Sequence, residues 1–315
     1  MKERIMILGA CGQIGTELTL SLRKKHGSQA VVACDLKEGS EELMNSGPFE
    51  QVNAMDAEAV EQIIDNYQVT QMYHLVAMLS ATAEQMPLKG WDLNMQSLMI
   101  ALELAKKGKL KKLFWPSSMG AFGPSSPKTM TPQHCVMEPT TVYGISKLAG
   151  EHWCQYYFDK YGVDVRSIRY PGIISWKTKP GGGTTDYAVD IYFQALEKGH
   201  YTSFLSSKTK LPMMYMDDAV KATIELMEAD PERLRIRTSY NLAAMSFDPS
   251  EMEASIKKHL PDFTLDYAPD FRQEIADSWP QSIDDTYARK DWDWKPDFDL
   301  DKMTATMIKA LTKKS

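Results

Sequence analysis

Short apolar runs alternate with longer amphipathic segments through the first half of this chain of 315 residues. Continuous apolar runs of this kind predict strands that are buried on both faces, and the amphipathic segments between them predict helices. Such strands pair in parallel, because each helix returns the chain to the same end of the sheet. The pattern therefore predicts an α/β fold with a doubly wound parallel sheet. The predicted strands cover 4–10, 30–36, 49–54, 72–79, 112–118 and 164–174.

The alternation loosens after about residue 175, where Gly, Pro, Thr and Ser accumulate and the apolar runs become brief. Only 212–216 and 239–244 still resemble strands. We therefore expect a smaller, mixed α/β region that caps the sheet domain, with the chain returning to the sheet. The predicted division gives 1–174 and 213–246 to the sheet domain, and 175–212 and 247–315 to the capping region.

The net charge, the apolar runs and the cysteine positions argue against several kinds of partner and site. A formal net charge of −6 disfavours nucleic acid and anionic membranes, which attract basic surfaces. No apolar run approaches the roughly 18 residues that a membrane helix needs, and no targeting pattern precedes the first predicted strand. The cysteines are scattered without a CxxC pair, which favours a cytoplasmic, reduced protein without a metal site. They are Cys11, Cys34, Cys135 and Cys154.

A glycine-rich turn directly follows the first predicted strand and opens the first predicted helix. In "GACGQIG", Gly9, Gly12 and Gly15 permit a tight turn and let a pyrophosphate approach the backbone at a helix N-terminus. Asp35 ends the second predicted strand, 20 residues beyond Gly15. A carboxylate there binds the ribose diol and repels a 2′-phosphate, which favours NAD over NADP. The nearby Lys37 keeps NADP open as the alternative.

Tyr143 and Lys147, four residues apart in "YGISK", share one face of a predicted helix. An ammonium beside a phenol lowers the phenol pKa from about 10, which would make Tyr143 a general base for an alcohol proton. A plain contact on a helix surface is the alternative. Ser118 ends a predicted strand 25 residues earlier, where its hydroxyl could hold the reacting oxygen. Asn94 is a polar residue in a largely apolar predicted helix, so it also belongs to the catalytic candidates.

Together these motifs resemble the extended short-chain dehydrogenase/reductase family, which includes the nucleotide-sugar epimerases and dehydratases. The resemblance runs from residue 5 to about residue 300 and implies a Rossmann domain with NAD across the carboxyl ends of the strands. The motifs that carry it are "GACGQIG", Asp35, "PSSMGAFG", "YGISK", "RYPGI", "MMYMDDAV" and "SYNLA".

The resemblance also implies a set of cofactor contacts. The glycine turn would meet the pyrophosphate, and Asn53 stands where the family usually has an Asp near the adenine. Lys147 would hold the ribose hydroxyls, and Ile173 would lie beside the nicotinamide. The complete predicted set is Gly9, Gly12, Gln13, Ile14, Gly15, Asp35, Asn53, Ala54, Val76, Ala77, Tyr143, Lys147 and Ile173.

The segment "KPGGGTTDYAVD", residues 179–190, follows the last predicted strand of the sheet domain. A mobile hairpin tip is one interpretation, but it does not explain the threonines beside the glycines. Alternatively, the glycines let the backbone close over a ligand, while Thr184 and Thr185 bind a carboxylate or an ammonium. The segment has few basic and aromatic groups for a nucleotide sugar. A small zwitterionic substrate therefore fits it better.

Longer stretches resemble one branch of the family, the short-chain L-threonine 3-dehydrogenases. They include "SGPFEQVNAMD", "PSSMGAFGPSSP", "PGGGTTDYAV" and "LPMMYMDDA". The resemblance implies NAD-dependent oxidation of the L-threonine C3 hydroxyl to 2-amino-3-oxobutanoate without zinc. It also implies a link to a CoA-dependent ligase that acts on this product, and a homodimer through the helix that carries Tyr143. A nucleotide-sugar epimerase or dehydratase, and a non-catalytic NAD-binding protein, are the alternatives.

The resemblance assigns roles around the substrate. Ser118 and Tyr143 would bind the C3 oxygen, and Tyr143 would accept its proton. Lys147 would relay that proton toward solvent together with Asn94. Trp279 would close the pocket, with a core tryptophan as the alternative. The residues predicted to bind substrate are Ser80, Ser118, Tyr143, Thr184, Thr185 and Trp279.

Overall fold

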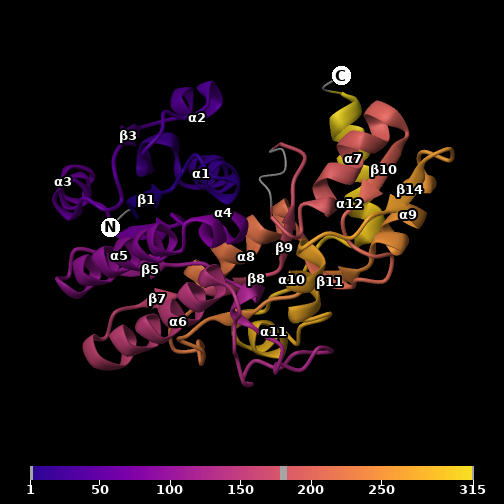
Figure 1. Ribbon diagram of the computed structural model, residues 1–315. Helices are drawn as coiled ribbons and strands as arrows, with labels where there is room; N and C mark the ends of the chain where they lie inside the picture. Colours follow the sequence, from indigo (N-terminus) through magenta and orange to yellow (C-terminus); the bar gives the residue numbers. More distant parts are fainter. Residues whose placement is uncertain (1–2, 178–182, 314–315) are drawn as a thin grey trace.

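Six parallel strands form the main sheet of the computed structural model, which describes residues 3–177 and 183–313 (Figure 1). Their order across the sheet is β3-β2-β1-β4-β5-β7, and every neighbouring pair is parallel. The predicted α/β fold with a doubly wound parallel sheet is therefore confirmed. The strands are β1 (Ile5–Leu8), β2 (Val31–Asp35), β3 (Phe49–Gln51), β4 (Gln71–His74), β5 (Lys112–Phe114) and β7 (Val165–Arg166).

Helices cover both faces of this sheet, as a doubly wound fold requires. Side chains from α1 (Gln13–His26), α8 (Met216–Glu228) and α11 (Thr286–Trp292) pack with the strands in one hydrophobic cluster. A second cluster on the opposite face contains side chains from α3 (Ala57–Tyr67), α5 (Pro87–Lys106) and α6 (Val142–Tyr161). The short helix α2 (Glu41–Asn45) joins the first cluster through Leu43.

Two prolines divide strands that the sequence predicts as continuous. The predicted strand 112–118 is β5 followed by β6 (Ser117–Ser118), with Pro116 before the second piece. The predicted strand 164–174 is β7, β8 (Ile168–Tyr170) and β9 (Gly172–Ile174), with Pro171 before the last piece. Proline has no N–H for a strand ladder, so pairing changes at these points.

The shorter strands build two further sheets beside the main one. β8 pairs in parallel with β6 and with β12 (Tyr240–Asn241). β9 pairs in parallel with β11 (Leu211–Tyr215), which pairs antiparallel with β13 (Met245–Phe247). These sheets carry the chain from the main sheet into the capping region.

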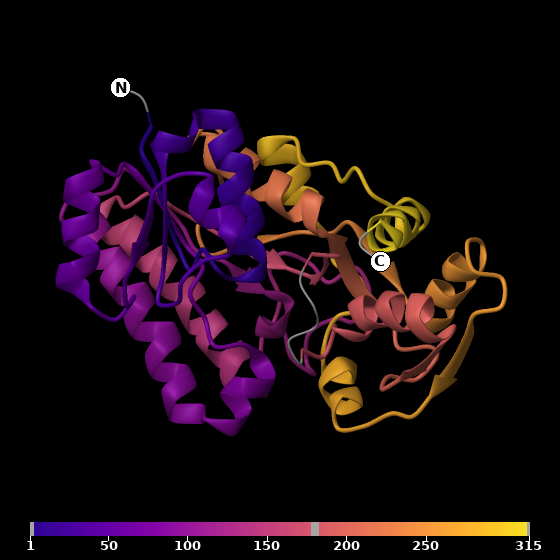
Figure 2. The ribbon, with the colours of Figure 1, turned by 90° about the horizontal axis from the view of Figure 1, so that it is seen from above.

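The capping region has its own hydrophobic cluster and lies to one side of the main sheet (Figure 2). A parallel pair of strands, β10 and β14, lies in this region among four helices. The predicted smaller region of mixed α/β structure is therefore present. Its elements are α7 (Tyr187–Lys198), β10 (His200–Ser203), α9 (Pro249–Lys257), β14 (Thr264–Tyr267), α10 (Arg272–Ser278) and α12 (Leu300–Thr312).

One part of the predicted capping region packs against the main sheet instead. Ala288, Trp292 and Trp294 belong to the cluster under α1 and α8. The next segment is fixed by the buried Asp218 of α8, whose carboxylate accepts the N–H groups of Asp297 (2.8 Å) and Phe298 (3.0 Å). The C-terminal part of the chain therefore crosses from the sheet domain back to the cap at a buried carboxylate.

We expect Asp218→Ala to lower the free energy of unfolding by about 2 kcal/mol, because two backbone N–H groups lose their shared acceptor. Urea unfolding followed by circular dichroism measures this change. Asp217→Ala is the matched control, since Asp217 is the exposed neighbour at the same helix N-terminus. Equal effects of the two substitutions would contradict the anchoring role of Asp218.

Candidate active site

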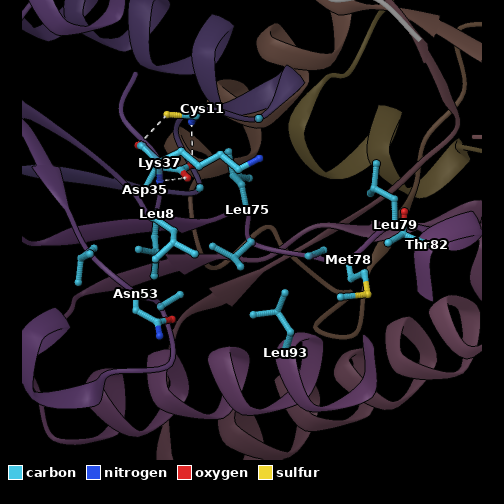
Figure 3. A pocket seen from close by; sticks show the side chains of 17 residues that line it. Leu8, Cys11, Asp35, Lys37, Asn53, Leu75, Met78, Leu79, Thr82 and Leu93 are labelled. Atoms are coloured by element: carbon cyan, nitrogen blue, oxygen red, sulfur yellow. Dashed lines mark hydrogen bonds between the residues drawn. The ribbon is translucent and has the colours of Figure 1, made fainter. Parts of the chain in front are cut away.

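A cavity of about 600 Å³ lies at the carboxyl ends of β1, β2 and β4 (Figure 3). In parallel α/β sheets this edge is where ligands bind. The segment after β4, predicted as strand to residue 79, leaves the sheet at His74 and lines the cavity instead. Seven residues of the predicted cofactor set line it: Gly9, Gly12, Asp35, Asn53, Ala54, Val76 and Ala77.

Each glycine of the turn meets a different requirement. Gly9 has φ +95°, and a Cβ there would lie 3.0 Å from the Val76 nitrogen. A Cβ on Gly15 would lie 2.2 Å from the Gly9 oxygen, so α1 packs this closely on the turn only without a side chain. A Cβ on Gly12 would meet only the Gly9 oxygen, at 3.4 Å. Gly12 thus leaves open space at the N-terminus of α1, where free N–H groups and the helix dipole favour an anion.

Asp35 ends β2 at the rim of the cavity, and backbone donors fix its carboxylate. Its Oδ2 accepts the Cys11 N–H at 2.9 Å, and its Oδ1 accepts the Lys37 N–H at 3.1 Å. Figure 3 shows these three residues together at one side of the cavity, with Leu79 and Thr82 at the other. Burial, together with the charge of Asp35, raises the pKa of the Cys11 thiol to about 11. Cys11 is therefore a neutral thiol at physiological pH.

The other members of the predicted cofactor set do not line this cavity. Gln13 and Ile14 form the first turn of α1, and the half-buried Ile173 lies in β9 against the core of the main sheet. Within the cavity, the Asn53 amide oxygen accepts the Met55 N–H at 3.0 Å. That oxygen is thus already engaged by the chain.

Ser118, Tyr143 and Lys147 come together at the contact between β6 and α6. The side chains of Ser118 and Tyr143 meet beside Gly120, where a Cβ would lie 3.5 Å from Ser118 Oγ and 3.4 Å from Tyr143 Cδ1. The Lys147 ammonium donates to the Pro116 carbonyl at 2.6 Å and lies 5.4 Å from the centre of the Tyr143 ring. It also lies 4.5 Å from the centre of the Trp115 ring. The predicted serine, tyrosine and lysine therefore form one cluster.

The electrostatics of this cluster differ from the expectation for its tyrosine. Burial raises the pKa of Tyr143 to about 12, and the hydrogen bond with Ser118 opposes that shift. Burial lowers the pKa of Lys147 to about 7, opposed by Cys154 and Glu151. The net shift of the Tyr143 pKa in the chain by itself is thus upward, opposite to the predicted lowering, because the loss of hydration disfavours the phenolate. Further positive charge is needed at the ring to favour the phenolate.

The Asn94 side chain, predicted to take part in the proton relay, is held by two neighbouring segments. Its Oδ1 accepts the Met78 N–H at 2.7 Å, while its Nδ2 donates to the Met78 carbonyl and to Ser146 Oγ, both at 3.2 Å. In the described part of the chain no hydrogen bond joins Asn94 to the side chain of Tyr143 or Lys147. Asn94 instead ties the cavity wall after β4 to α6.

The remaining predicted substrate residues come from three separate segments. Thr184 is buried, and the half-buried Thr185 packs on β9, with Cγ2 2.8 Å from where a Gly172 Cβ would lie. Ser80 is a buried residue at the start of α4 (Ser80–Gln85). Trp279 packs in the hydrophobic cluster of the cap, as its alternative interpretation states. Lys179 and the two glycines at 181 and 182, which complete the predicted loop, lie outside the described residues.

The model of the NAD dependent epimerase/dehydratase family matches residues 5–243. This chain belongs to that family. An uncharacterized epimerase/dehydratase of Staphylococcus haemolyticus is 54% identical to it over 314 residues, 99% of this chain and 98% of the relative.

Two solved structures resemble this family member over almost its full length. The holo form of a GalE-like L-threonine dehydrogenase from Cupriavidus necator is 51% identical with a TM-score of 0.95, covering 98% of this chain and 99% of that one. L-threonine dehydrogenase from Clostridium difficile is 47% identical with a TM-score of 0.97, covering 99% of this chain and 98% of that one.

As a member of the epimerase/dehydratase family, the chain is an NAD-dependent oxidoreductase. The cavity residues fit NAD. The turn leaves room for a pyrophosphate at Gly12, where a Cβ would enter open space, and the fixed carboxylate of Asp35 suits a ribose diol. Apolar side chains such as Val52 and Leu75 line the same cavity. These residues lie at the carboxyl ends of the strands and would hold the NAD dinucleotide there.

The described ranges contain no group of three or more His, Cys, Asp or Glu residues that could hold a metal ion. Over the same ranges, none of the helices of this epimerase/dehydratase family member is long and apolar enough to cross a membrane.

Several cavity residues escaped the sequence analysis. They are mostly apolar and lie in segments that resemble ordinary core or helix, so composition gives no reason to select them. The run "HLVAML", residues 74–79, carried a usable signal. It continues five residues beyond the end of β4 at His74, which indicates that the segment leaves the strand. The residues that were missed include Leu36, Met78, Leu79, Thr82 and Leu93.

The two glycines of the turn in this epimerase/dehydratase family member predict a pair of contrasting variants. Gly12→Ala should keep wild-type stability but weaken NAD binding at least tenfold, because its methyl group enters the cavity. Gly15→Ala should weaken NAD binding and also lower the free energy of unfolding by about 1–3 kcal/mol, since its Cβ would overlap the Gly9 carbonyl. Calorimetric titration with NAD and urea unfolding measure both properties. NAD binding by Gly12→Ala with wild-type affinity would contradict the site.

Proposed function

We propose that this chain oxidises the C3 hydroxyl of L-threonine to 2-amino-3-oxobutanoate with NAD as hydride acceptor. The observation that carries the proposal is the near-complete match to two L-threonine dehydrogenase structures at about half identity. The cluster of Ser118, Tyr143 and Lys147 supplies the chemistry that such an oxidation needs.

In the proposed mechanism the substrate loses a hydride from C3 and a proton from its hydroxyl, leaving a ketone. NAD, when bound, accepts the hydride. Tyr143 as phenolate accepts the hydroxyl proton, and Ser118 donates a hydrogen bond to the same oxygen. Lys147 places positive charge near the ring and so favours the phenolate over the neutral phenol. Asn94 supports this arrangement by holding Met78 and Ser146, rather than by carrying the proton.

The amino-acid end of the substrate needs partners for a carboxylate and an ammonium. We propose Ser80, Thr184 and Thr185 for this role. The packing of Thr185 on Gly172 supports it, because it brings the threonine segment against β9, which also carries Ile173. The cofactor contacts of the glycine turn, Asp35, Asn53, Ala54, Val76 and Ala77 are proposed on the cavity that they line.

We also propose that the protein is a homodimer that associates through α5 and α6. These adjacent helices expose large apolar side chains that a monomer would leave in water. The exposed side chains are Leu88, Trp91, Ile145 and Trp153.

The substrate proposal is tested by mixing the purified protein with NAD and L-threonine and recording NADH absorbance at about 340 nm. We expect steady NADH formation that depends on both reactants. UDP-glucose is the comparison substrate, since a nucleotide-sugar epimerase regenerates its NAD and yields no net NADH. Activity on UDP-glucose combined with no NADH from L-threonine would show that the protein is an epimerase rather than a dehydrogenase. NAD binding without activity on either substrate would favour a non-catalytic protein.

Tyr143→Phe tests the base. The variant keeps the ring but lacks the proton acceptor, so we expect NAD binding to persist while kcat falls about 10²–10⁴-fold. Tyr67→Phe is the control, because it removes a phenolic oxygen from the end of α3, whose partner is Glu50 rather than the catalytic cluster. Turnover by Tyr143→Phe at the wild-type rate would refute the assignment.

A further inference from the structure

Three consecutive residues around β6 each contact one of three residues spaced by four on α6. The Ser118 hydroxyl and the Tyr143 ring meet beside Gly120, where a Cβ would lie 3.5 Å and 3.4 Å from them. The Pro116 carbonyl accepts from Lys147 Nζ at 2.6 Å. Between them, the Ser117 hydroxyl donates to Glu151 Oε1 at 2.6 Å. A spacing of four places Tyr143, Lys147 and Glu151 along one face of the helix. The helix and the strand are thus joined at three successive points, of which the catalytic pair is only one.

Glu151 is held rigidly from its other side. Arg169 of β8 donates from Nε to Glu151 Oε1 at 2.9 Å and from Nη2 to Oε2 at 2.7 Å. Arg169 Nη1 donates in turn to the Gln133 carbonyl and to Asn241 Oδ1, at 3.0 Å and 2.9 Å. The side chains of Glu151 and Arg169 are 1% and 4% exposed. A bidentate pair of this kind fixes the carboxylate in position, and with it the serine that donates to that carboxylate.

The titratable groups that face Lys147 come from two elements. His74 of β4 is fully buried, and its pKa falls to about 4, first through burial and also through Lys147, so it is neutral near pH 7. Burial raises the pKa of the Cys154 thiol, which is neutral as well. On α6 the remaining groups are Tyr143 and Glu151, and the charge of Glu151 raises the pKa of Lys147. Glu151 is therefore the negative group that faces Lys147 within the described chain.

We propose that Glu151 is a positioning residue of the oxidation: through Ser117 it holds β6 against α6, so that the Ser118 hydroxyl stays on the Tyr143 phenol. Ser117 and Ser118 are adjacent in a two-residue strand, so displacement of one moves the other. The alternative is a buried ion pair that contributes only to stability. The kinetic part of the test rests on the proposed function, whereas its spectroscopic part needs no substrate.

The first experiment measures the ionisation of Tyr143 in the NAD complex. It is followed as the ultraviolet difference between each protein and its Tyr143→Phe counterpart. Because the Ser118 hydrogen bond lowers the pKa of Tyr143, loss of the Ser117–Glu151 contact should raise that pKa. We expect the rise in Glu151→Gln and also in Ser117→Ala, which leaves the charge of Glu151 in place. An unchanged titration in both variants overturns the proposal, whether or not L-threonine is a substrate.

The second experiment compares the kinetics of NADH formation. We expect kcat to fall about tenfold to a hundredfold in Glu151→Gln, as for a small misplacement of reacting groups, with the KM for NAD within twofold of wild type. Removing the charge of Glu151 lowers the pKa of Lys147, so the alkaline limb of the rate profile should shift to lower pH. Ser117→Ala should lower kcat without that shift. Glu151→Asp, which keeps the charge, should restore the alkaline limb.

Asp164→Asn is the matched control for both experiments. Asp164 lies at the amino end of β7 and forms ion pairs with Arg166 and Arg237, both at 2.8 Å. It should reduce the free energy of unfolding and leave kcat, the pH profile and the Tyr143 titration unchanged. If Glu151→Gln and Ser117→Ala behave like Asp164→Asn, Glu151 is only structural and the proposal is wrong. A wild-type protein that gives no NADH while the Tyr143 titration shifts as expected contradicts the substrate, not the role of Glu151.

Discussion

The close approach of α6 to the strands is the contact on which the rest of the candidate site depends. Gly150 permits it, because a Cβ there would lie 2.3 Å from Trp115 Cη2. Trp115 in turn lies 4.5 Å below the Lys147 ammonium, which reaches the next residue's carbonyl, that of Pro116. A wider spacing between helix and strand would therefore separate Lys147 from its acceptor and Tyr143 from Ser118. A second glycine of α6, Gly144, is needed as well, because a Cβ there would lie 2.2 Å from the Gly120 oxygen.

Burial has opposite consequences for the two ionisable groups at this contact. It disfavours the phenolate of Tyr143 and the ammonium of Lys147 alike, so each group by itself tends toward its neutral form. The reaction needs both as ions, and an ion pair is less costly to bury than either ion alone. Proton transfer to Tyr143 therefore depends on further positive charge that binds near its ring. The Glu151–Arg169 pair behind it supplies fixed charge without access to water.

The sequence predicts the features that depend on local spacing. The glycine turn, Asp35, the Tyr-Lys pair and the parallel sheet each rest on residues near one another in the chain. The structure places the glycine turn and Asp35 at the cavity and the Tyr-Lys pair on α6, beside β6. Asn94 could be selected as unusual, but its partners Met78 and Ser146 depend on tertiary packing. The same holds for Trp292 and Trp294, which are distant in sequence from the sheet core that they fill. Glu151 had a local signal, eight residues after Tyr143, although only its contacts with Ser117 and Arg169 give that spacing a meaning.

The chain leaves the main sheet at Pro116, after β5, and again at Ser167, after β7, and it changes ladder once more at Pro171. The main sheet carries the cavity with Asp35, while β9, β11 and β13 form an independent ladder against which Thr185 packs. Substitutions in β11 and β13 can alter the packing of this ladder and touch no residue that lines the cavity. Under the proposed function, a lineage could therefore exchange one alcohol substrate for another while retaining its redox partner, because the two tasks lie on separate ladders of the backbone.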